Sequence, residues 1–97
     1  RLVRALEHAR ALAPDYGIVS GDLTAIGIRP EFERARELLA PLVGDASRWL
    51  VIPGNHDRYT VPSDRAGLYE QSFGAWRRAE LALTERRTPY ARFFGDL

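Results

Sequence analysis

The stretch that decides the fold reads Trp49-Leu50-Val51-Ile52-Pro53-Gly54-Asn55-His56-Asp57. Its first four residues form a short apolar run, which predicts a strand over 49–52. Pro53 and Gly54 stop that strand, because both residues favour turns over continued pairing. Three polar side chains follow at once, so the sequence predicts a loop that presents them at the carboxyl end of the strand.

A second stretch, 16–24, has the same organisation. It begins with the apolar, β-branched run Tyr-Gly-Ile-Val-Ser, which predicts a buried strand over 16–20. Gly21 and Asp22 break the run directly afterwards. A loop is expected over 23–29, in which Gly27 can adopt a positive φ angle.

Helices are predicted before and between the two strands. Apolar residues recur every three to four positions over 1–13, which indicates an amphipathic helix that Pro14 ends. Pro30 suits a first helical turn, and the apolar period that follows predicts a helix over 30–40, closed before Pro41. Strand, helix and strand in this order form a βαβ crossover with parallel pairing. The predicted fold class is therefore α/β.

The last third of the sequence is less regular. A helix is expected to begin at Pro62-Ser63-Asp64 and to carry four apolar side chains, namely Leu68, Tyr69, Phe73 and Trp76. A further helix is predicted over 75–87, ended before Pro89. The apolar and aromatic residues 90–97 are not assigned to an element.

The bulk composition limits the classes of protein. The chain has 97 residues, enough for one small domain, with 45% hydrophobic and 28% charged residues. The net charge of +1 gives no field that would attract nucleic acid or an acidic membrane. No apolar run reaches the roughly 20 residues of a membrane-spanning helix. With no cysteine and no signal-like apolar segment at Arg1, a cytoplasmic protein without thiolate metal sites is expected.

Parallel strands joined by one crossover release their loops at the same edge of the sheet, where α/β folds bind ligands. Asp22 and Asn55 should therefore converge there, together with His56 and Asp57. Such oxygen and imidazole donors suit Mn, Fe, Zn or Mg. Two cations about 3.5–4 Å apart can clamp the attacking and leaving oxygens of a phosphoryl displacement. The sequence therefore places at this edge the kinds of side chain that a metal-assisted site would use.

An ordinary turn is the alternative interpretation of each loop. Gly-Asp after a strand is common turn chemistry and says little alone. Gly-Asn-His-Asp is rarer, since average residue usage gives it by chance in roughly one chain of this size in a few thousand. The occurrence of both loops on one βαβ unit favours a functional site over two structural turns.

Two motifs carry a resemblance to a known family, Gly21-Asp22-Leu23-Thr24 and Pro53-Gly54-Asn55-His56-Asp57. They resemble the calcineurin-like metallophosphoesterase superfamily and, within it, the bacterial branch related to cyclic nucleotide phosphodiesterases. The resemblance covers about 13–60, including Pro14-Asp15. It implies a β-sandwich flanked by helices (αββα) and a hydrolase that cleaves phosphoesters, phosphodiesters above all. The nucleophile would be a hydroxide activated by two divalent metal ions, their identity open among Mn, Fe, Zn and Mg.

The resemblance also implies roles for single residues. Asp22 matches the carboxylate that bridges the metals, Asn55 a ligand of the second metal, and His56 the acid near the leaving group. Arg58 and Tyr59 follow directly and are candidate substrate contacts. The expected partner is a small-molecule phosphoester such as a cyclic nucleotide, and the balanced charge disfavours nucleic acid. The oligomeric state stays open.

Three departures from the family pattern limit these expectations. The Asp-x-His motif that supplies ligands to the first metal does not occur upstream of Asp22, and no histidine follows His56. Ala25 stands where many relatives have an aspartate that orients the histidine. Together with absent start signals, this predicts that 1–97 is a partial metallophosphoesterase domain. The alternative is a non-catalytic interaction module on the same scaffold.

Overall fold

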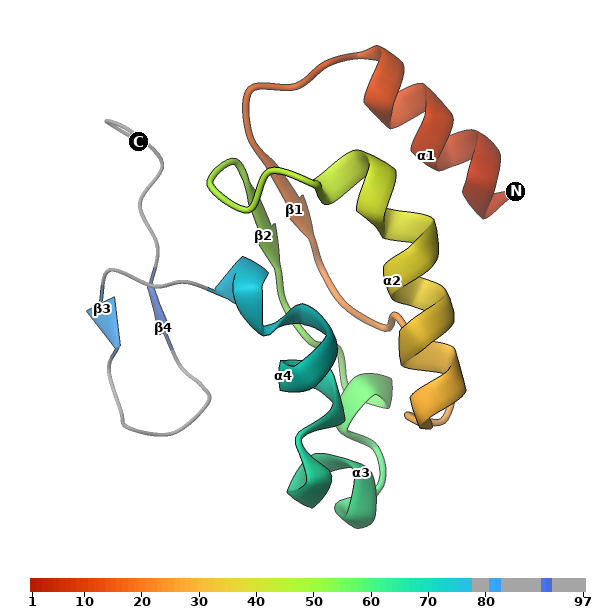
Figure 1. Cartoon of the computed structure of the whole chain (residues 1–97), viewed down its shortest axis with the longest axis vertical. Coiled ribbons are helices and arrows are strands. Elements are labelled where there is room, and N and C mark those ends of the chain that lie inside the picture. Colours follow the sequence, from red (N-terminus) through yellow and green to blue (C-terminus); the bar gives the residue numbers. More distant parts are fainter. Residues whose placement is uncertain (78–80, 83–89, 92–97) are drawn as a thin grey trace.

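The first half of the chain folds as helix, strand, helix and strand, in the predicted order (Figure 1). The structure is a computed structural model that describes residues 1–77, 81–82 and 90–91. The four elements are α1 (Leu2–Ala11), β1 (Gly17–Val19), α2 (Arg29–Val43) and β2 (Trp49–Val51). Pro14 lies beyond the end of α1, and both strands fall inside their predicted ranges. The predicted burial of the first strand is wrong, because Ile18 at its centre is 62% exposed. The α/β class predicted from the two apolar runs is confirmed for this half.

The strands β1 and β2 pair in parallel, as the crossover predicts. The register sets Gly17 opposite Trp49 and Val19 opposite Val51. The pairing is extended by the backbone N–H of Ile52, which donates to the carbonyl oxygen of Val19 at 3.0 Å. Since Val19 and Val51 are both the last residues of their strands, the two following loops leave the sheet side by side.

The helix α2 runs through Pro41 to Val43, so the predicted end before Pro41 is wrong. Proline removes one hydrogen bond of the helix and crowds the preceding turn. Packing outweighs that cost here, because Val43 is only 1% exposed in the core. The indole N–H of Trp76 also donates to the carbonyl oxygen of Val43 and so satisfies one acceptor at the helix end.

Short helices follow β2 in place of the long ones predicted. They are η1 (His56–Arg58), α3 (Val61–Ala66), α4 (Leu68–Phe73) and η2 (Gly74–Arg77). The predicted start near Pro62 is confirmed, with the Thr60 hydroxyl accepting from the N–H of Ser63. Gly67 then adopts a left-handed conformation, φ +67°, and divides the expected single helix into α3 and α4.

The predicted helix over 75–87 is wrong in its described part. Residues 74–77 form the 3-10 helix η2, and β3 (Leu81–Ala82) pairs antiparallel with β4 (Tyr90–Ala91). The remainder of that prediction, over 78–80 and 83–87, lies outside the described residues. The described strands thus form one parallel and one antiparallel pair. The β-sandwich that the family resemblance implied is not confirmed.

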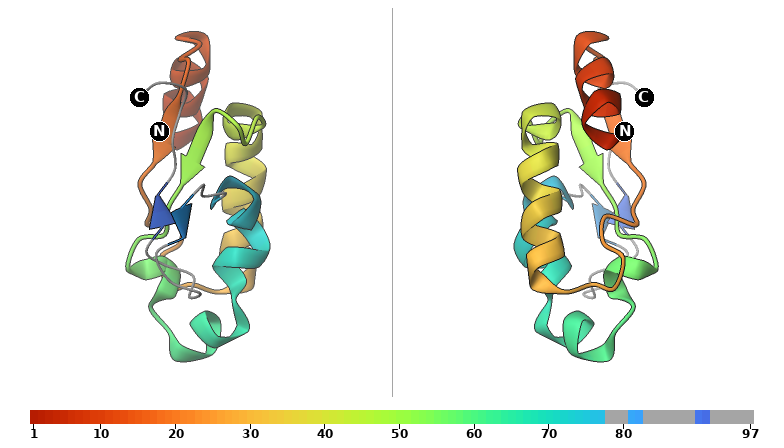
Figure 2. Two further views of the ribbon diagram at one scale, coloured as in Figure 1. Left: turned by 90° about the vertical axis from the view of Figure 1, so that its left-hand side faces the viewer. Right: turned by 90° about the vertical axis from the view of Figure 1, so that its right-hand side faces the viewer.

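The hydrophobic core lies between α2, β2 and α4. Figure 2 shows α2 and α4 on the same side of the β1–β2 pair. The buried apolar side chains come from these three elements, namely Phe32, Ala35, Leu39, Val43, Val51, Tyr69 and Phe73. The core therefore packs against β2 and fixes the position of the strand from which the second loop departs.

The helix α1 packs against α2 (Figure 1), but none of its residues is buried. Its apolar residues Leu2 and Val3 are 56% and 50% exposed. The helix is thus amphipathic, as predicted, and leaves part of its apolar face in contact with solvent. Among the described residues, no helix combines the length and the apolar character needed to cross a bilayer.

Candidate functional site

The loops that follow β1 and β2 meet at the edge where both strands end. The backbone N–H of His56, in the second loop, donates to Oδ1 of Asp22, in the first, at 3.2 Å. The sequence predicted this meeting from the parallel crossover, and the structure brings the two residues into direct contact. The site is therefore assembled from two segments that are distant in the sequence.

Glycine is required at Gly21 and Gly54 for the loops to come so close. A Cβ atom on Gly54 would lie 2.1 Å from Oδ1 of Asp22, and one on Gly21 would lie 2.3 Å from the Gly54 nitrogen. Gly21 also has φ +92°, which L side chains rarely adopt. These two glycines thus allow the Asp22 carboxylate to lie against the opposite backbone.

Asp22 itself has a left-handed backbone, with φ +51°. Aspartate tolerates this region better than most residues, but the conformation is still uncommon. Oδ1 of its exposed carboxylate accepts the N–H of His56, and a carboxylate has further lone pairs to offer. The loop therefore presents an anionic oxygen in a fixed direction.

His56 is held through one of its two ring nitrogens. Nδ1 lies 2.7 Å from the carbonyl oxygen of Ala25. A carbonyl only accepts, so Nδ1 carries a proton and Nε2 is the nitrogen that remains available. The ring of Tyr59 stacks on the imidazole, with centroids 5.6 Å apart and an angle of 9° between the planes. Ala25, which stands where many relatives have an aspartate that orients the histidine, thus contacts His56 through its backbone carbonyl.

Asp57 is a buried brace between the loops, a role that sequence reasoning missed. Its side chain is 1% exposed. Oδ1 accepts from the N–H and the hydroxyl of Thr24, at 2.8 and 3.0 Å, and Oδ2 accepts from the N–H of Gly54, at 2.9 Å. The sequence analysis counted this carboxylate among the candidate metal ligands. In the structure, both of its oxygens accept hydrogen bonds that hold the two loops together. Nothing in the local sequence distinguishes that role from a ligand.

Arg58 extends away from the loops towards α3 and α4. Its guanidinium pairs with the Asp64 carboxylate at 2.6 Å and with the Glu70 carboxylate, and it lies 5.4 Å from the centre of the Tyr69 ring. Burial lowers the pKa of Arg58, but the hydrogen bonds and charges of Asp64 and Glu70 more than offset this, so the net shift is upward. Its role as a substrate contact stays a prediction, as does that of Tyr59.

Asp22 and Asn55 are the residues that could hold a divalent cation. They offer a carboxylate and an amide oxygen, both exposed, and hard cations prefer such donors. Within 1–77, 81–82 and 90–91, however, no group of three or more His, Cys, Asp or Glu side chains could hold a metal ion. The described residues therefore fit part of a metal site and do not make up a complete one.

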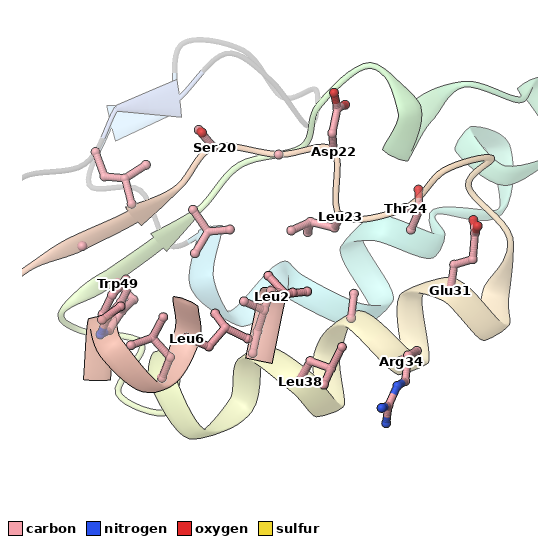
Figure 3. Close-up of a pocket in the computed structure, with 18 of the residues that line it drawn as sticks. Leu2, Leu6, Ser20, Asp22, Leu23, Thr24, Glu31, Arg34, Leu38 and Trp49 are labelled. Carbon is pink, nitrogen blue, oxygen red and sulfur yellow. The ribbon is translucent and has the colours of Figure 1, made fainter. Parts of the chain in front are cut away.

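An apolar groove of about 870 Å³ lies beside these loops, between α1, β1 and α2. Figure 3 shows Leu2, Leu6 and Leu23 around this space, whereas the Asp22 carboxylate points away from it. The groove and the candidate site are thus adjacent but face different directions. The sequence did not predict the groove, because it depends on how loosely α1 packs.

The chain matches the model of a known protein family. The family model of calcineurin-like phosphoesterases matches residues 1–94, a wider range than the 13–60 of the motif resemblance. The family model does not distinguish the branch related to cyclic nucleotide phosphodiesterases, so membership of that branch stays an expectation. No curated protein and no solved structure matches the chain.

Proposed function

Because the chain belongs to the calcineurin-like phosphoesterase family, we propose that Asp22, Asn55 and His56 serve in the hydrolysis of phosphodiesters. The family carries out metal-dependent phosphoester hydrolysis in general. One observation supports these residues most strongly: the His56 backbone bonds to the Asp22 carboxylate at 3.2 Å. This bond brings the carboxylate and the histidine residue to the same edge of the sheet, where both could serve one phosphoryl group.

Asp22 and Asn55 are the metal ligands in this proposal. Two divalent cations, when bound, supply an activated nucleophile and neutralise charge on the phosphoryl oxygens. Asp22 contributes the anionic oxygen and Asn55 a neutral one, and the Gly21–Gly54 contact keeps the two loops in register. The remaining ligands would come from outside the described residues. Ion identity stays open among Mn, Fe, Zn and Mg.

His56 is the proposed general acid. Its Nδ1–H is engaged by the Ala25 carbonyl at 2.7 Å, so the proton to be donated must be a second one, carried on Nε2 in the imidazolium form of the ring. As the attacking oxygen forms a new P–O bond and the bond to the leaving oxygen breaks, donation from Nε2 lets the leaving group depart as an alcohol and not as a strongly basic alkoxide. A well-placed general acid contributes about 10²–10⁴-fold to the rate.

The preference for diesters, and for cyclic nucleotides among them, rests on the two motifs and on the ring beside the acid. Tyr59 is 67% exposed and stacks on His56, so its aromatic surface is available to a flat substrate group. The proposal therefore favours a diester with an aromatic or heterocyclic alcohol over a simple alkyl phosphate.

The deciding experiment compares His56→Ala with His8→Ala on 3′,5′-cyclic AMP, a diester whose leaving group is an alkoxide, and on the monoester p-nitrophenyl phosphate, with Mn²⁺ or Zn²⁺ supplied. His8 lies exposed on α1 and serves as the matched control. We expect His56→Ala to lower kcat by about 10²–10⁴-fold, with unchanged bound metal and the diester as the better substrate. Equal turnover in both variants would remove His56 from the acid role.

A non-catalytic interaction module is the second candidate function. It is favoured by one observation, that the described residues contain no group of three potential metal-binding side chains. Metal titration followed by calorimetry discriminates the two functions. Absence of both divalent-metal binding and hydrolysis in the protein would support the module, whereas metal-dependent hydrolysis that Asp22→Ala abolishes would support the enzyme.

A further inference from the structure

Glu31, in the first turn of α2, binds three consecutive backbone amides with one carboxylate oxygen. Its Oε2 accepts from the N–H groups of Ile26 and Gly27, both at 3.1 Å, and from that of Ile28 at 3.4 Å. A carboxylate that accepts several N–H bonds at a helix N-terminus is well placed for both charge and geometry. The segment 25–28 is therefore fastened to α2 through this side chain.

The same segment reaches the imidazole of His56. The residue before the three amides is Ala25, whose carbonyl oxygen lies 2.7 Å from Nδ1 of His56. Gly27, buried and with φ +72°, packs so closely that a Cβ there would lie 3.0 Å from the carbonyl oxygen of His56. The segment thus touches both the ring and the backbone of the histidine.

We propose that Glu31 is a positioning residue for His56. By holding the amides of 26–28, it sets the direction of the Ala25 carbonyl and thereby keeps the Nδ1–H tautomer of the imidazole. Nε2 is then the nitrogen left for chemistry. The catalytic meaning of this device rests on the function proposed for His56, but the tautomer is a property that can be measured without substrate.

Helix capping is the ordinary structural role of a glutamate at this position. It must be distinguished from the positioning of His56. Glu31 occupies the third helical position and bonds back to the N–H of the N-cap residue Ile28. A cap alone would influence the stability of α2 and leave the imidazole unchanged. A readout on the histidine nitrogens therefore decides between the two roles.

The measurement is ¹⁵N NMR of the histidine side chains, recorded where the imidazoles are neutral. In the wild type we expect His56 to show a protonated Nδ1 and an unprotonated Nε2. An Nε2–H tautomer in the wild type would overturn the proposal at once. His8, the other histidine of the sequence, reports in the same spectrum on any general effect.

Glu31→Gln tests the link itself. Glutamine keeps the length and one oxygen acceptor but removes the negative charge, so the three hydrogen bonds that one carboxylate oxygen accepts become weaker. We expect His56 to become a mixture of tautomers in this variant, with His8 unchanged. Glu33→Gln, an exposed position two residues further along α2, is the matched control and should leave both histidines unchanged.

Gly27→Ala disturbs the same segment without touching the carboxylate. The added Cβ meets the His56 carbonyl oxygen at 3.0 Å, and φ +72° strains an alanine, so we expect the segment to adjust and to disturb the Ala25 carbonyl. An unaltered Nδ1–H tautomer in both folded variants would show that neither Glu31 nor its segment positions the ring. A normal tautomer pattern in a wild type that hydrolyses nothing would instead contradict only the proposed function.

Discussion

Asp57 and Thr24 lie 33 positions apart in the sequence, and two hydrogen bonds join them at one carboxylate oxygen. The backbone N–H of Thr24 donates at 2.8 Å and its hydroxyl at 3.0 Å. The second oxygen of Asp57 accepts from Gly54. One buried carboxylate thus ties the loop that carries Asp22 to the loop that carries His56. The candidate site depends on this brace before any ligand enters it.

Asp57→Asn should destabilise the protein by about 1–3 kcal/mol, because the asparagine NH₂ group would face an N–H donor and leave it unsatisfied. The side chain is 1% exposed, so water cannot replace the lost acceptor. The urea midpoint of unfolding measures this effect. Asp15→Asn, at an exposed position, should leave the midpoint within error.

A double-mutant cycle measures how much of the stabilisation by Asp57 depends on the Thr24 hydroxyl. Thr24→Val removes the hydroxyl and keeps the N–H, and should cost about 1 kcal/mol in the wild-type background. In an Asp57→Ala background, where the acceptor has been removed, the same change should cost clearly less. Additive losses would mean that the hydroxyl and the carboxylate act independently, against the geometry described.

Gly54→Ala should destabilise the fold and displace Asp22. The new Cβ would lie 2.1 Å from Oδ1 and 2.3 Å from the nitrogen of Asp22, so the two loops must separate. Overpacking of this kind costs about 1–3 kcal/mol. The midpoint temperature of thermal unfolding and the affinity for divalent metal ions should both fall.

Gly74→Ala is the matched control for this substitution. A Cβ at Gly74 meets nothing within 4 Å, and its backbone is right-handed helical, φ −57°. The variant should be neutral or more stable by about 0.4–1 kcal/mol. Equal destabilisation at both glycines would contradict the close contact between the loops.

The sequence alone predicted the crossover and the meeting of the two loops. Both follow from local signals, since each apolar run stops at a glycine beside a polar residue, and parallel strands end at one edge. The register confirms this, with Val19 opposite Val51. The candidate residues Asp22 and His56 could therefore be placed together without coordinates.

The parts that sequence reasoning missed depend on contacts between distant segments. Helix α2 passes Pro41 because Val43 is buried and Trp76 binds its carbonyl oxygen. Asp57 serves as a brace because Thr24, in another loop, supplies two donors. Local propensity carries no information on either pairing. The contact between the Ala25 carbonyl and His56 could not be predicted from the sequence either, since every residue type has a backbone carbonyl.

Glu31 should give the protein an acid-sensitive component of stability. The hydrogen bond from Ile26 and those from the neighbouring amides outweigh the opposing effect of burial and hold the pKa of Glu31 below its ordinary value of 4.5. A carboxyl whose pKa is lower in the folded state stabilises the fold fully above about 4.5, and this contribution is lost as pH falls through the folded pKa.

Comparison with Glu31→Gln isolates that component. The difference in unfolding free energy between wild type and Glu31→Gln should be largest near neutral pH and should shrink as the pH falls below about 4.5. Urea unfolding across the acid range measures the free energy of unfolding of both proteins, and a pH-independent difference for Glu31→Gln would contradict the linkage.

Arg58→Gln should destabilise the protein by about 1–3 kcal/mol, because it leaves the Glu70 carboxylate without its cation. The side chains of Arg58 and Glu70 are only 23% and 20% exposed, so solvent screens the pair weakly. Arg34→Gln is the control. Arg34 and Glu37 are 66% and 68% exposed on one helix face, and such pairs contribute at most about 0.5 kcal/mol.

The same pair of variants separates the two roles of Arg58. If the guanidinium serves to join η1 to α3 and α4, then Arg58→Gln lowers the urea midpoint, and the KM for bis(p-nitrophenyl) phosphate stays near that of the wild type. If it contacts the substrate phosphate, KM rises while the midpoint matches that of Arg34→Gln. The ion pairs with Asp64 and Glu70 favour the first outcome, because they already engage the guanidinium from two sides.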